Sequence, residues 1–279
     1  MTGTEPLQDI KPDDEMQVEK DTPLSQLING ARNPAPLVAQ IATDVVIEKA
    51  TKNGFAIVGA RNTFSSNGAQ SYYAGRIAEN DLIGIVCSRS PGSVAVFGSI
   101  DPLFGTNPIG FSFPTLNEPL VFDSATSAMT FYGLILADIK GEKLPEGITI
   151  DKNGNPTIEP KEVIDGGAIL PFDKSYKGAG FGMVVELLAG PLINSAFLDY
   201  KTFDKEWGST FIAISPNLLT DTNEFKQKVS DFIQTIKSSR KSPKAKSIRL
   251  PGESANELRI QAEQSGFVDV DDDVLEKIK

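Results

Sequence analysis

Histidine is absent from all 279 residues of the chain. Histidine is the usual general base near neutral pH and a frequent metal ligand. Its absence excludes Ser-His-Asp triads, histidine-rich zinc sites and the HExxH motif of metalloproteases, and we expect no metal centre. Any acid–base chemistry must therefore rest on aspartate, glutamate, lysine, tyrosine or a cofactor.

Cysteine and long apolar runs are also scarce. The one cysteine, Cys87, cannot form an internal disulfide, which fits a reducing compartment, and it stands in an apolar run that predicts a buried strand. No apolar run reaches the roughly 18 to 20 residues that span a bilayer. The first twenty residues lack the apolar core of a signal peptide. We expect a cytoplasmic protein with no membrane partner.

Basic residues are fewer than acidic residues, 27 against 37, which gives a net charge of −10. Such a balance argues against nucleic acid or an anionic membrane as a partner. The run KSSRKSPKAKSIR, residues 237–249, has six positive charges and leaves a phosphate or membrane patch conceivable. We favour a solvated helix end and linker, because serine and proline interrupt the run.

Large apolar residues are rare at the N-terminus. Residues 1–30 are polar and acidic, and we predict a flexible tail there because so few apolar groups cannot repay the entropy of ordering. Residues 31–279 then form one domain.

Alternating helical and strand patterns begin at residue 35. Apolar residues at helical spacing predict a helix over 35–52, and the Asn-Gly pair that follows is a stop signal. An apolar strand over 55–60, a helix over 68–81 and a second strand over 82–88 come next. Strand, helix and strand in this order indicate a parallel pair in an α/β core.

The second half continues the α/β pattern. Short strands are expected over 109–113 and 119–123, and a polar loop over 151–160. A helix over 177–192 ends at a Gly-Pro pair. A strand over 210–215 precedes a helix over 223–239 that is apolar on one face.

Three strings carry a family resemblance. They are GTNPIGFSFP at 105–114, PLVFDSATS at 119–127 and KGAGFGMVVELLAGPL at 177–192. In this order they closely resemble the malate/L-lactate dehydrogenase family that does not use a Rossmann fold, and NGNPTIEP at 153–160 and RLPGE at 249–253 add to the match. The resemblance is collinear from about Leu37 to Lys279, which is more specific than any one string.

The resemblance implies a fold and an activity. The fold is an α/β three-layer sandwich with a mixed sheet, not a Rossmann fold, and the protein is expected to be a homodimer. The activity is that of an NAD(P)-dependent oxidoreductase, which transfers hydride between NAD or NADP and a small 2-hydroxy or 2-oxo acid. Read alone, GAGFG has the spacing G-x-G-x-G and indicates only a closely packed helix start.

The same resemblance implies where the cofactor binds. Each residue also has a plainer interpretation: Ser90 and Asp123 could cap turns, and Lys177 could be a surface charge. A cation at a helix start is slightly unfavourable with the helix dipole, which favours a functional role for Lys177. The implied cofactor-binding residues are Ser90, Asn107, Asp123, Ser124, Ala125 and Lys177.

The loop NTFSSNGAQSYYAGR, residues 62–76, lacks the group that the family uses. In the family a histidine here exchanges a proton with the substrate, and counting back from Gly68 places Ser66 at that position. A serine hydroxyl is too weak an acid or base at neutral pH without an activating partner. The candidates left for proton transfer are Asp123, Lys177, Tyr72 and a water bound by Ser66.

A second departure concerns the N-terminus. The family begins with a helical segment that bears an Asp-Ser-His-Gly motif, which this chain does not show, so we expect an N-terminally truncated member. Two interpretations remain open. The protein is either an active NAD(P)-dependent oxidoreductase or a catalytically inactive family member that binds a cofactor or another protein.

Overall fold

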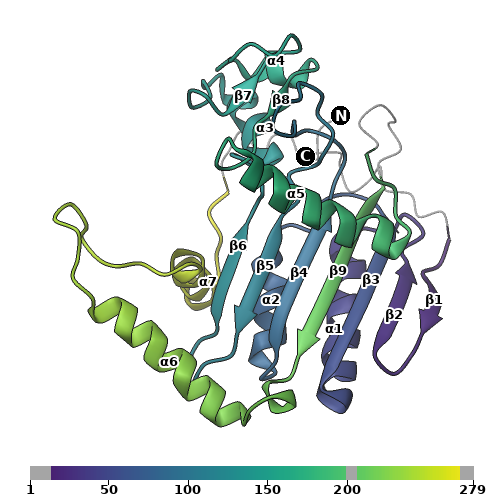
Figure 1. Cartoon of the computed structure of the whole chain (residues 1–279), viewed down its shortest axis with the longest axis vertical. Coiled ribbons are helices and arrows are strands. Elements are labelled where there is room, and N and C mark those ends of the chain that lie inside the picture. Colours follow the sequence, from purple (N-terminus) through teal and green to yellow (C-terminus); the bar gives the residue numbers. More distant parts are fainter. Residues whose placement is uncertain (1–13, 199–205, 271–279) are drawn as a thin grey trace.

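A seven-stranded sheet forms the body of the computed structural model, which describes residues 14–198 and 206–270 (Figure 1). The strand order is β1-β2-β3-β9-β4-β5-β6, and the sheet is open. β2 and β3 pair in parallel and all other neighbours pair antiparallel, so the sheet is mixed as predicted. The strands are β1 (Gln17–Asp21), β2 (Ser25–Asn29), β3 (Phe55–Thr63), β4 (Ile83–Arg89), β5 (Ile109–Phe113), β6 (Leu120–Ser124) and β9 (Trp207–Ile214).

α1 and α2 cover one face of the sheet, and α5 crosses one end of the other face (Figure 1). On β4, Val86 packs into the main core with residues of α1 (Ala35–Asn53) and α2 (Gln70–Glu79). Its neighbour Cys87 points to the opposite face and packs against Val185 of α5 (Tyr176–Ala189). Successive strand residues alternate between faces, so α1 and α2 form one layer and α5 another. The predicted three-layer α/β fold is confirmed.

Local signals set the helix ends. α1 stops at Gly54, whose φ of 84° is the left-handed conformation that suits glycine. α5 begins after Ser175, whose side chain accepts a hydrogen bond from Lys177 N, and it ends before the Gly190-Pro191 pair. The helices predicted over 35–52, 68–81, 177–192 and 223–239 are all present with ends shifted by a few residues.

A small lobe stands above one end of the sheet (Figure 1). It has a separate apolar cluster that includes Phe104, Leu134, Leu144 and Ile169. The expected loop over 151–160 lies here between a strand and a helix. The lobe contains α3 (Phe131–Lys140), β7 (Thr149–Ile150), α4 (Pro160–Ile164) and β8 (Ala168–Ile169).

Two helices, α6 (Thr222–Ser238) and α7 (Glu253–Ser265), lie beyond the β6 edge (Figure 1). Neither contains a buried residue. Residues 239–247 between them are exposed, as predicted for the basic run. Short 3-10 turns are formed by Pro191–Ile193 and Pro216–Leu218. Within the described ranges, no helix combines the length and apolar character that crossing a membrane requires.

Two predictions need correction. The flexible tail proposed for residues 1–30 is wrong for 17–29, because β1 and β2 form there and β2 joins β3 in the sheet. Residues 1–13 lie outside the described part of the chain. The strands near 55–60 and 82–88 run in the same direction but are not paired. β9 lies between them and pairs antiparallel with both.

Candidate functional site

One end of the sheet collects the predicted site residues. β3 ends at Thr63, β4 at Arg89 and β6 at Ser124, and the antiparallel β5 and β9 begin at this same end. The loops that leave these strand ends carry Ser66, Ser90, Asn107 and Ala125. α5 crosses the sheet at this end (Figure 1).

The loop between β3 and α2 is held by a buried asparagine. Asn67 Nδ2 donates hydrogen bonds to Ser88 Oγ (2.9 Å) and Ser209 Oγ (2.7 Å), on β4 and β9. Tyr73 OH donates to the Asn67 carbonyl oxygen at 2.8 Å. The loop is therefore fixed to two strands and one helix. The sequence interpretation missed Asn67, because a single polar residue in a polar loop gives no signal of burial.

Ser66 lies next to this anchor and is exposed. Its Oγ accepts a hydrogen bond from Gly68 N at 3.1 Å, and among the described residues no carboxylate, lysine or tyrosine forms a hydrogen bond with it. Its neighbour Ser65 has a φ of 74°, which is strained for a residue other than glycine. The structure thus gives Ser66 a rigid position and no partner that could activate it.

The two tyrosines that follow have different environments. Tyr73 is buried, and burial together with the neighbouring Tyr72 raises the pKa of its hydroxyl to about 12. Tyr72 is 54% exposed and its ring faces the guanidinium of Arg76. Tyr73 is a structural residue, and Tyr72 is the tyrosine that can meet a ligand.

Asp123 stands on β6 beside the first turn of α2. Its Oδ2 accepts a hydrogen bond from Ser71 N at 2.8 Å. Burial raises the pKa of the Asp123 carboxyl, and the hydrogen bond from Ser71 opposes this shift. A partly buried carboxyl with a raised pKa is therefore placed at the start of the helix that follows the Ser66 loop. Raised carboxyl pKa values are common at sites of proton transfer.

Ser90 and Asn107 both lie inside the protein, not at its surface. Ser90 is only 6% exposed and packs on Gly105. Asn107 is fully buried, and its Nδ2 donates to Gly182 O (3.0 Å) and Glu186 Oε2 (2.8 Å) on α5. Both residues were predicted to contact a cofactor, yet little of either side chain is accessible.

The strand end after β6 is fastened to the same loop. Thr126 Oγ1 donates to the carbonyl oxygens of Asn107 (3.0 Å) and Thr106 (3.2 Å). Ser124 Oγ donates to Ala125 O at 2.9 Å, and both residues lie at the accessible strand end or directly after it. Ser124 pairs with Ile109 of β5 and is partly exposed, so it has surface available for a ligand, and Ala125 follows it with its backbone groups.

Lys177 is exposed in the first turn of α5. The amides of that turn are already bonded, since Lys177 N donates to Ser175 Oγ and Gly178 N donates to Asp173 Oδ1. The ammonium forms no ion pair within the described ranges. No hydrogen bond or ion pair between described residues joins Lys177 to Asp123 or Ser66, whereas Asp123 is bonded to Ser71 just after the Ser66 loop.

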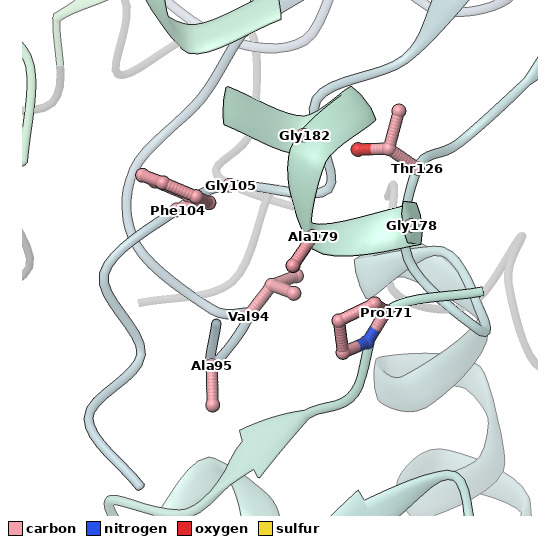
Figure 2. Close-up of a pocket in the computed structure, with 9 residues that line it drawn as sticks. All are labelled: Val94, Ala95, Phe104, Gly105, Thr126, Pro171, Gly178, Ala179 and Gly182. Atoms are coloured by element: carbon pink, nitrogen blue, oxygen red, sulfur yellow. The ribbon is translucent and has the colours of Figure 1, made fainter. Parts of the chain in front are cut away.

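A small cavity lies under the first turns of α5 (Figure 2). Its volume of about 10 Å³ is room for about one water molecule. Four segments form its walls: the loop after β4, the strand end after β6, the segment between β8 and α5, and α5 itself. The lining residues are Val94, Ala95, Phe104, Gly105, Thr126, Pro171, Gly178, Ala179 and Gly182.

Two charged residues in the interior were missed from the sequence. Arg89, at the end of β4, is 1% exposed and Glu186 of α5 is 3% exposed, with 3.4 Å between Arg89 Nε and Glu186 Oε1. Each is a lone charge in an apolar run, LIGIVCSR and GMVVELLAG. A charge that a strand or helix buries needs a partner, so these two isolated charges could have been predicted to pair.

Comparison with known proteins places the chain in a family. A family model described as malate/L-lactate dehydrogenase matches residues 7–279. The chain is 35% identical over 276 residues to malate/(S)-sulfolactate dehydrogenase of Methanothermus fervidus, covering 97% of this chain and 79% of the relative. It is 28% identical over 266 residues to ureidoglycolate dehydrogenase (NAD(+)) of Escherichia coli O157:H7, covering 92% and 75%.

Solved structures agree with the sequence match. The structure of sulfolactate dehydrogenase from Methanocaldococcus jannaschii superposes with a TM-score of 0.82 at 28% identity, covering 98% of this chain and 79% of that one. A putative malate/lactate dehydrogenase from E. coli gives a TM-score of 0.83 at 29% identity, covering 94% and 75%. The resemblance seen in the three sequence strings is confirmed. The chain belongs to the malate/L-lactate dehydrogenase family.

Proposed function

We propose that the protein is an NAD- or NADP-dependent oxidoreductase that acts on a small 2-hydroxy or 2-oxo acid. Malate and sulfolactate, which name its relatives, are such acids, and the ureidoglycolate relative is named for NAD(+). The observation that carries the proposal is a set of links at one end of the sheet: Asn107 bonds to α5 and to Thr126 after β6, and Gly105 of the same loop packs against Ser90.

The residues present fit a dinucleotide. Asp123, Ser124 and Ala125 offer a carboxylate, a hydroxyl and backbone groups at an accessible strand end, which suits hydroxyl and amide groups of a ligand. Lys177 offers a cation without an ion pair in the described part of the chain, which suits a phosphate. The cavity holds about one water, so we assign ligand contact to these accessible groups and not to the cavity.

The chemistry that such a cofactor supplies when bound is hydride transfer. The protein's own residues must hold the acid and move one proton. Ser66 has no activating partner, so we propose Asp123, Tyr72 or a water on Ser66 for that proton. Because none of these is a histidine poised near neutral pH, we expect slow turnover.

Titration calorimetry with NAD+, NADH, NADP+ and NADPH tests the proposal. At least one form should bind to the purified protein. The pair that binds more tightly, NAD+ and NADH or NADP+ and NADPH, identifies the cofactor. Absence of binding by all four at millimolar concentration contradicts it. The alternative, a catalytically inactive member, finds no support in the comparisons. It would gain support from tight nucleotide binding with no oxidation of malate, lactate or sulfolactate.

We further propose a cytoplasmic homodimer that uses the sheet face shared with α5. Below α5 this face carries an apolar row that runs across five strands, and each residue of the row is at least partly exposed. The row is at least about 19 Å wide, since neighbouring strands are about 4.8 Å apart. The residues of the row, in strand order, are Ile57, Ile212, Ile85, Phe111 and Phe122.

A second apolar row lies beside the first, with Phe55, Ile214, Ile83, Phe113 and Leu120. An apolar sheet face this wide must be buried to be stable, and a second copy of the chain presents the same face in a two-fold arrangement. Analytical ultracentrifugation should show a dimer at micromolar concentration. Phe111→Asp should give monomers, and Leu219→Asp, at a 96% exposed residue that belongs to neither row, should not. A monomeric wild-type protein contradicts this proposal.

A further inference from the structure

Asn107 joins three segments of the chain at one buried point. Its Nδ2 donates to Gly182 O and Glu186 Oε2, which ties the loop before β5 to α5. Its carbonyl oxygen accepts the hydrogen bond of Thr126 Oγ1, which ties that loop to the strand end after β6. Asn107 has a φ of 40°, a left-handed conformation that asparagine adopts more readily than other residues with a side chain.

Glu186 extends the connection to the end of β4. Its Oε1 faces Arg89 Nε at 3.4 Å, while its Oε2 accepts from Asn107. Arg89 Nη2 donates to Ser90 O at 3.1 Å, and Arg89 Nη1 donates to Glu206 O at 2.8 Å, just before β9. One guanidinium and one carboxylate therefore link α5 to Ser90 and to the entrance of β9.

The same three segments line most of the cavity of Figure 2, and Pro171 completes it. Gly105 belongs to the loop that ends at Asn107, Thr126 to the strand end, and Gly182 to α5. Each of these cavity walls is bonded directly to Asn107 or lies within two residues of it. The hydrogen bonds of the buried Asn107 therefore help to set the distance between the cavity walls, together with the small side chains that line them.

A buried ion pair is a poor source of net stability. Bringing both charges out of water costs about as much as their attraction returns, and apolar residues of equal size often stabilise as well. What the pair supplies is geometry, because each hydrogen bond fixes a direction as well as a distance. The placement of Arg89 and Glu186 thus indicates that the pair fixes the relative positions of the segments at this end of the sheet.

We propose that Arg89, Glu186 and Asn107 are positioning residues for nucleotide binding. They hold Ser90 and the segment 123–126 at a fixed distance from the first turns of α5, where Lys177 lies. They act through these neighbours and do not touch the ligand themselves. The inference rests on the proposed function, and it assigns Asn107 a different role from direct cofactor contact.

Glu186→Gln tests the inference with little change of shape. The substituted amide still offers an oxygen to Asn107 but no charge to Arg89. The dissociation constant of NADH or NADPH, from nucleotide fluorescence, should rise about tenfold or more, because small displacements of binding groups have large effects. Asn107→Ser replaces one uncharged side chain by another, and it should also raise the dissociation constant. Circular dichroism at the assay temperature shows that each variant is folded.

Val58→Ala separates positioning from general destabilisation. Val58 is fully buried in the main core on the opposite face of the sheet. This variant should lower the resistance to urea while leaving the dissociation constant unchanged. Arg89→Lys keeps a cation and should restore part of the affinity relative to Arg89→Leu.

The outcomes separate the two proposals. If wild-type protein binds the nucleotide and Glu186→Gln and Asn107→Ser bind it equally well, the positioning role is wrong and the proposed function stands. If Val58→Ala weakens binding as much as Glu186→Gln, the effect is general and the positioning role is again wrong. If the wild-type protein binds neither NADH nor NADPH, both proposals fail.

Discussion

Ser90 and Gly105 approach each other so closely that no side chain fits between them. A Cβ atom on Gly105 would lie 2.1 Å from Ser90 Oγ and 2.5 Å from the Ser90 carbonyl oxygen. Contacts this short do not occur in folded proteins, and one of the two atoms belongs to the backbone. Glycine at 105 is therefore required for the loop after β4 to pass against the end of that strand.

Gly105→Ala is expected to destabilise the protein by about 1–3 kcal/mol, the usual cost of overpacking a close contact. Ser90 would be displaced with it, so nucleotide affinity should fall as well. Gly180→Ala is the matched control. Gly180 lies within α5 with no neighbouring atom where a Cβ would be placed, so alanine there should stabilise by about 0.5–1 kcal/mol. Urea unfolding measures both, and a neutral Gly105→Ala would contradict the close approach.

Asp123 gives the protein a pH dependence of defined sign. Burial raises the pKa of its carboxyl above the ordinary value of 3.8, against the hydrogen bond from Ser71. Because the pKa is raised in the folded state, the contribution of Asp123 to the free energy of unfolding is fully present below the unfolded-state pKa. It is lost as the pH rises through the folded-state pKa. The charged carboxylate is thus the less stable form of the folded protein.

Asp123→Asn should therefore gain stability relative to wild type as the pH rises. Asparagine keeps an oxygen for Ser71 N and has no charge to bury. Urea unfolding at about pH 3.5 and about pH 7 should show the larger gain at the higher pH. Asp101→Asn, at an exposed loop position, is the control. A gain that is larger at the acidic pH would show that the hydrogen bond from Ser71 outweighs burial.

The elements that were predicted correctly depend on local signals. α1 combines apolar residues at helical spacing with the stop at Gly54, and α5 ends at the Gly190-Pro191 pair. β1 has no such signal because all five of its residues are exposed. Its order comes from backbone hydrogen bonds to β2, which composition does not reveal. The flexible tail was predicted for this reason.

The pairing of strands that are distant in the sequence could not be predicted either. The order of β3, α2 and β4 correctly gave their common direction, but nothing local indicates that β9 lies between the two strands. The arrangement of the candidate site likewise depends on contacts between distant segments. The family resemblance assigned Ser90 and Asn107 to cofactor binding, whereas their burial and the nearby Arg89–Glu186 pair arise from contacts between distant elements. Such contacts are visible only in three dimensions.

Lys177→Gln is expected to weaken nucleotide binding about tenfold, the value of one hydrogen bond from a charged donor. The exposed ammonium should act on a phosphate through water, so the difference from wild type should shrink at high salt. Lys174→Gln removes an equally exposed lysine three residues earlier and serves as the control. Equal affinity of Lys177→Gln and wild type at low salt would remove Lys177 from the site.

The histidine that this chain lacks can be returned to a loop that is already ordered. Ser66 is exposed, and its neighbour Asn67 anchors the loop to β4 and β9, so an imidazole at 66 meets solvent and leaves the anchor intact. General acid–base help typically increases a rate by about 10² to 10⁴. Ser66→His should therefore speed the reduction of pyruvate or oxaloacetate by NADH or NADPH, measured from nucleotide absorbance.

Two further variants make this prediction specific. Asn153→His adds an imidazole to an exposed loop of the small lobe and should leave the rate unchanged. Ser66→Ala removes the hydroxyl and should slow the reaction only if a water on Ser66 moves the proton. If the wild-type protein already turns over rapidly, and Ser66→Ala matches it, another group carries the proton. Asp123 and Tyr72 would then be the residues to replace, because Asp123 is bonded to the first turn of α2 and Tyr72 is the exposed tyrosine of that turn.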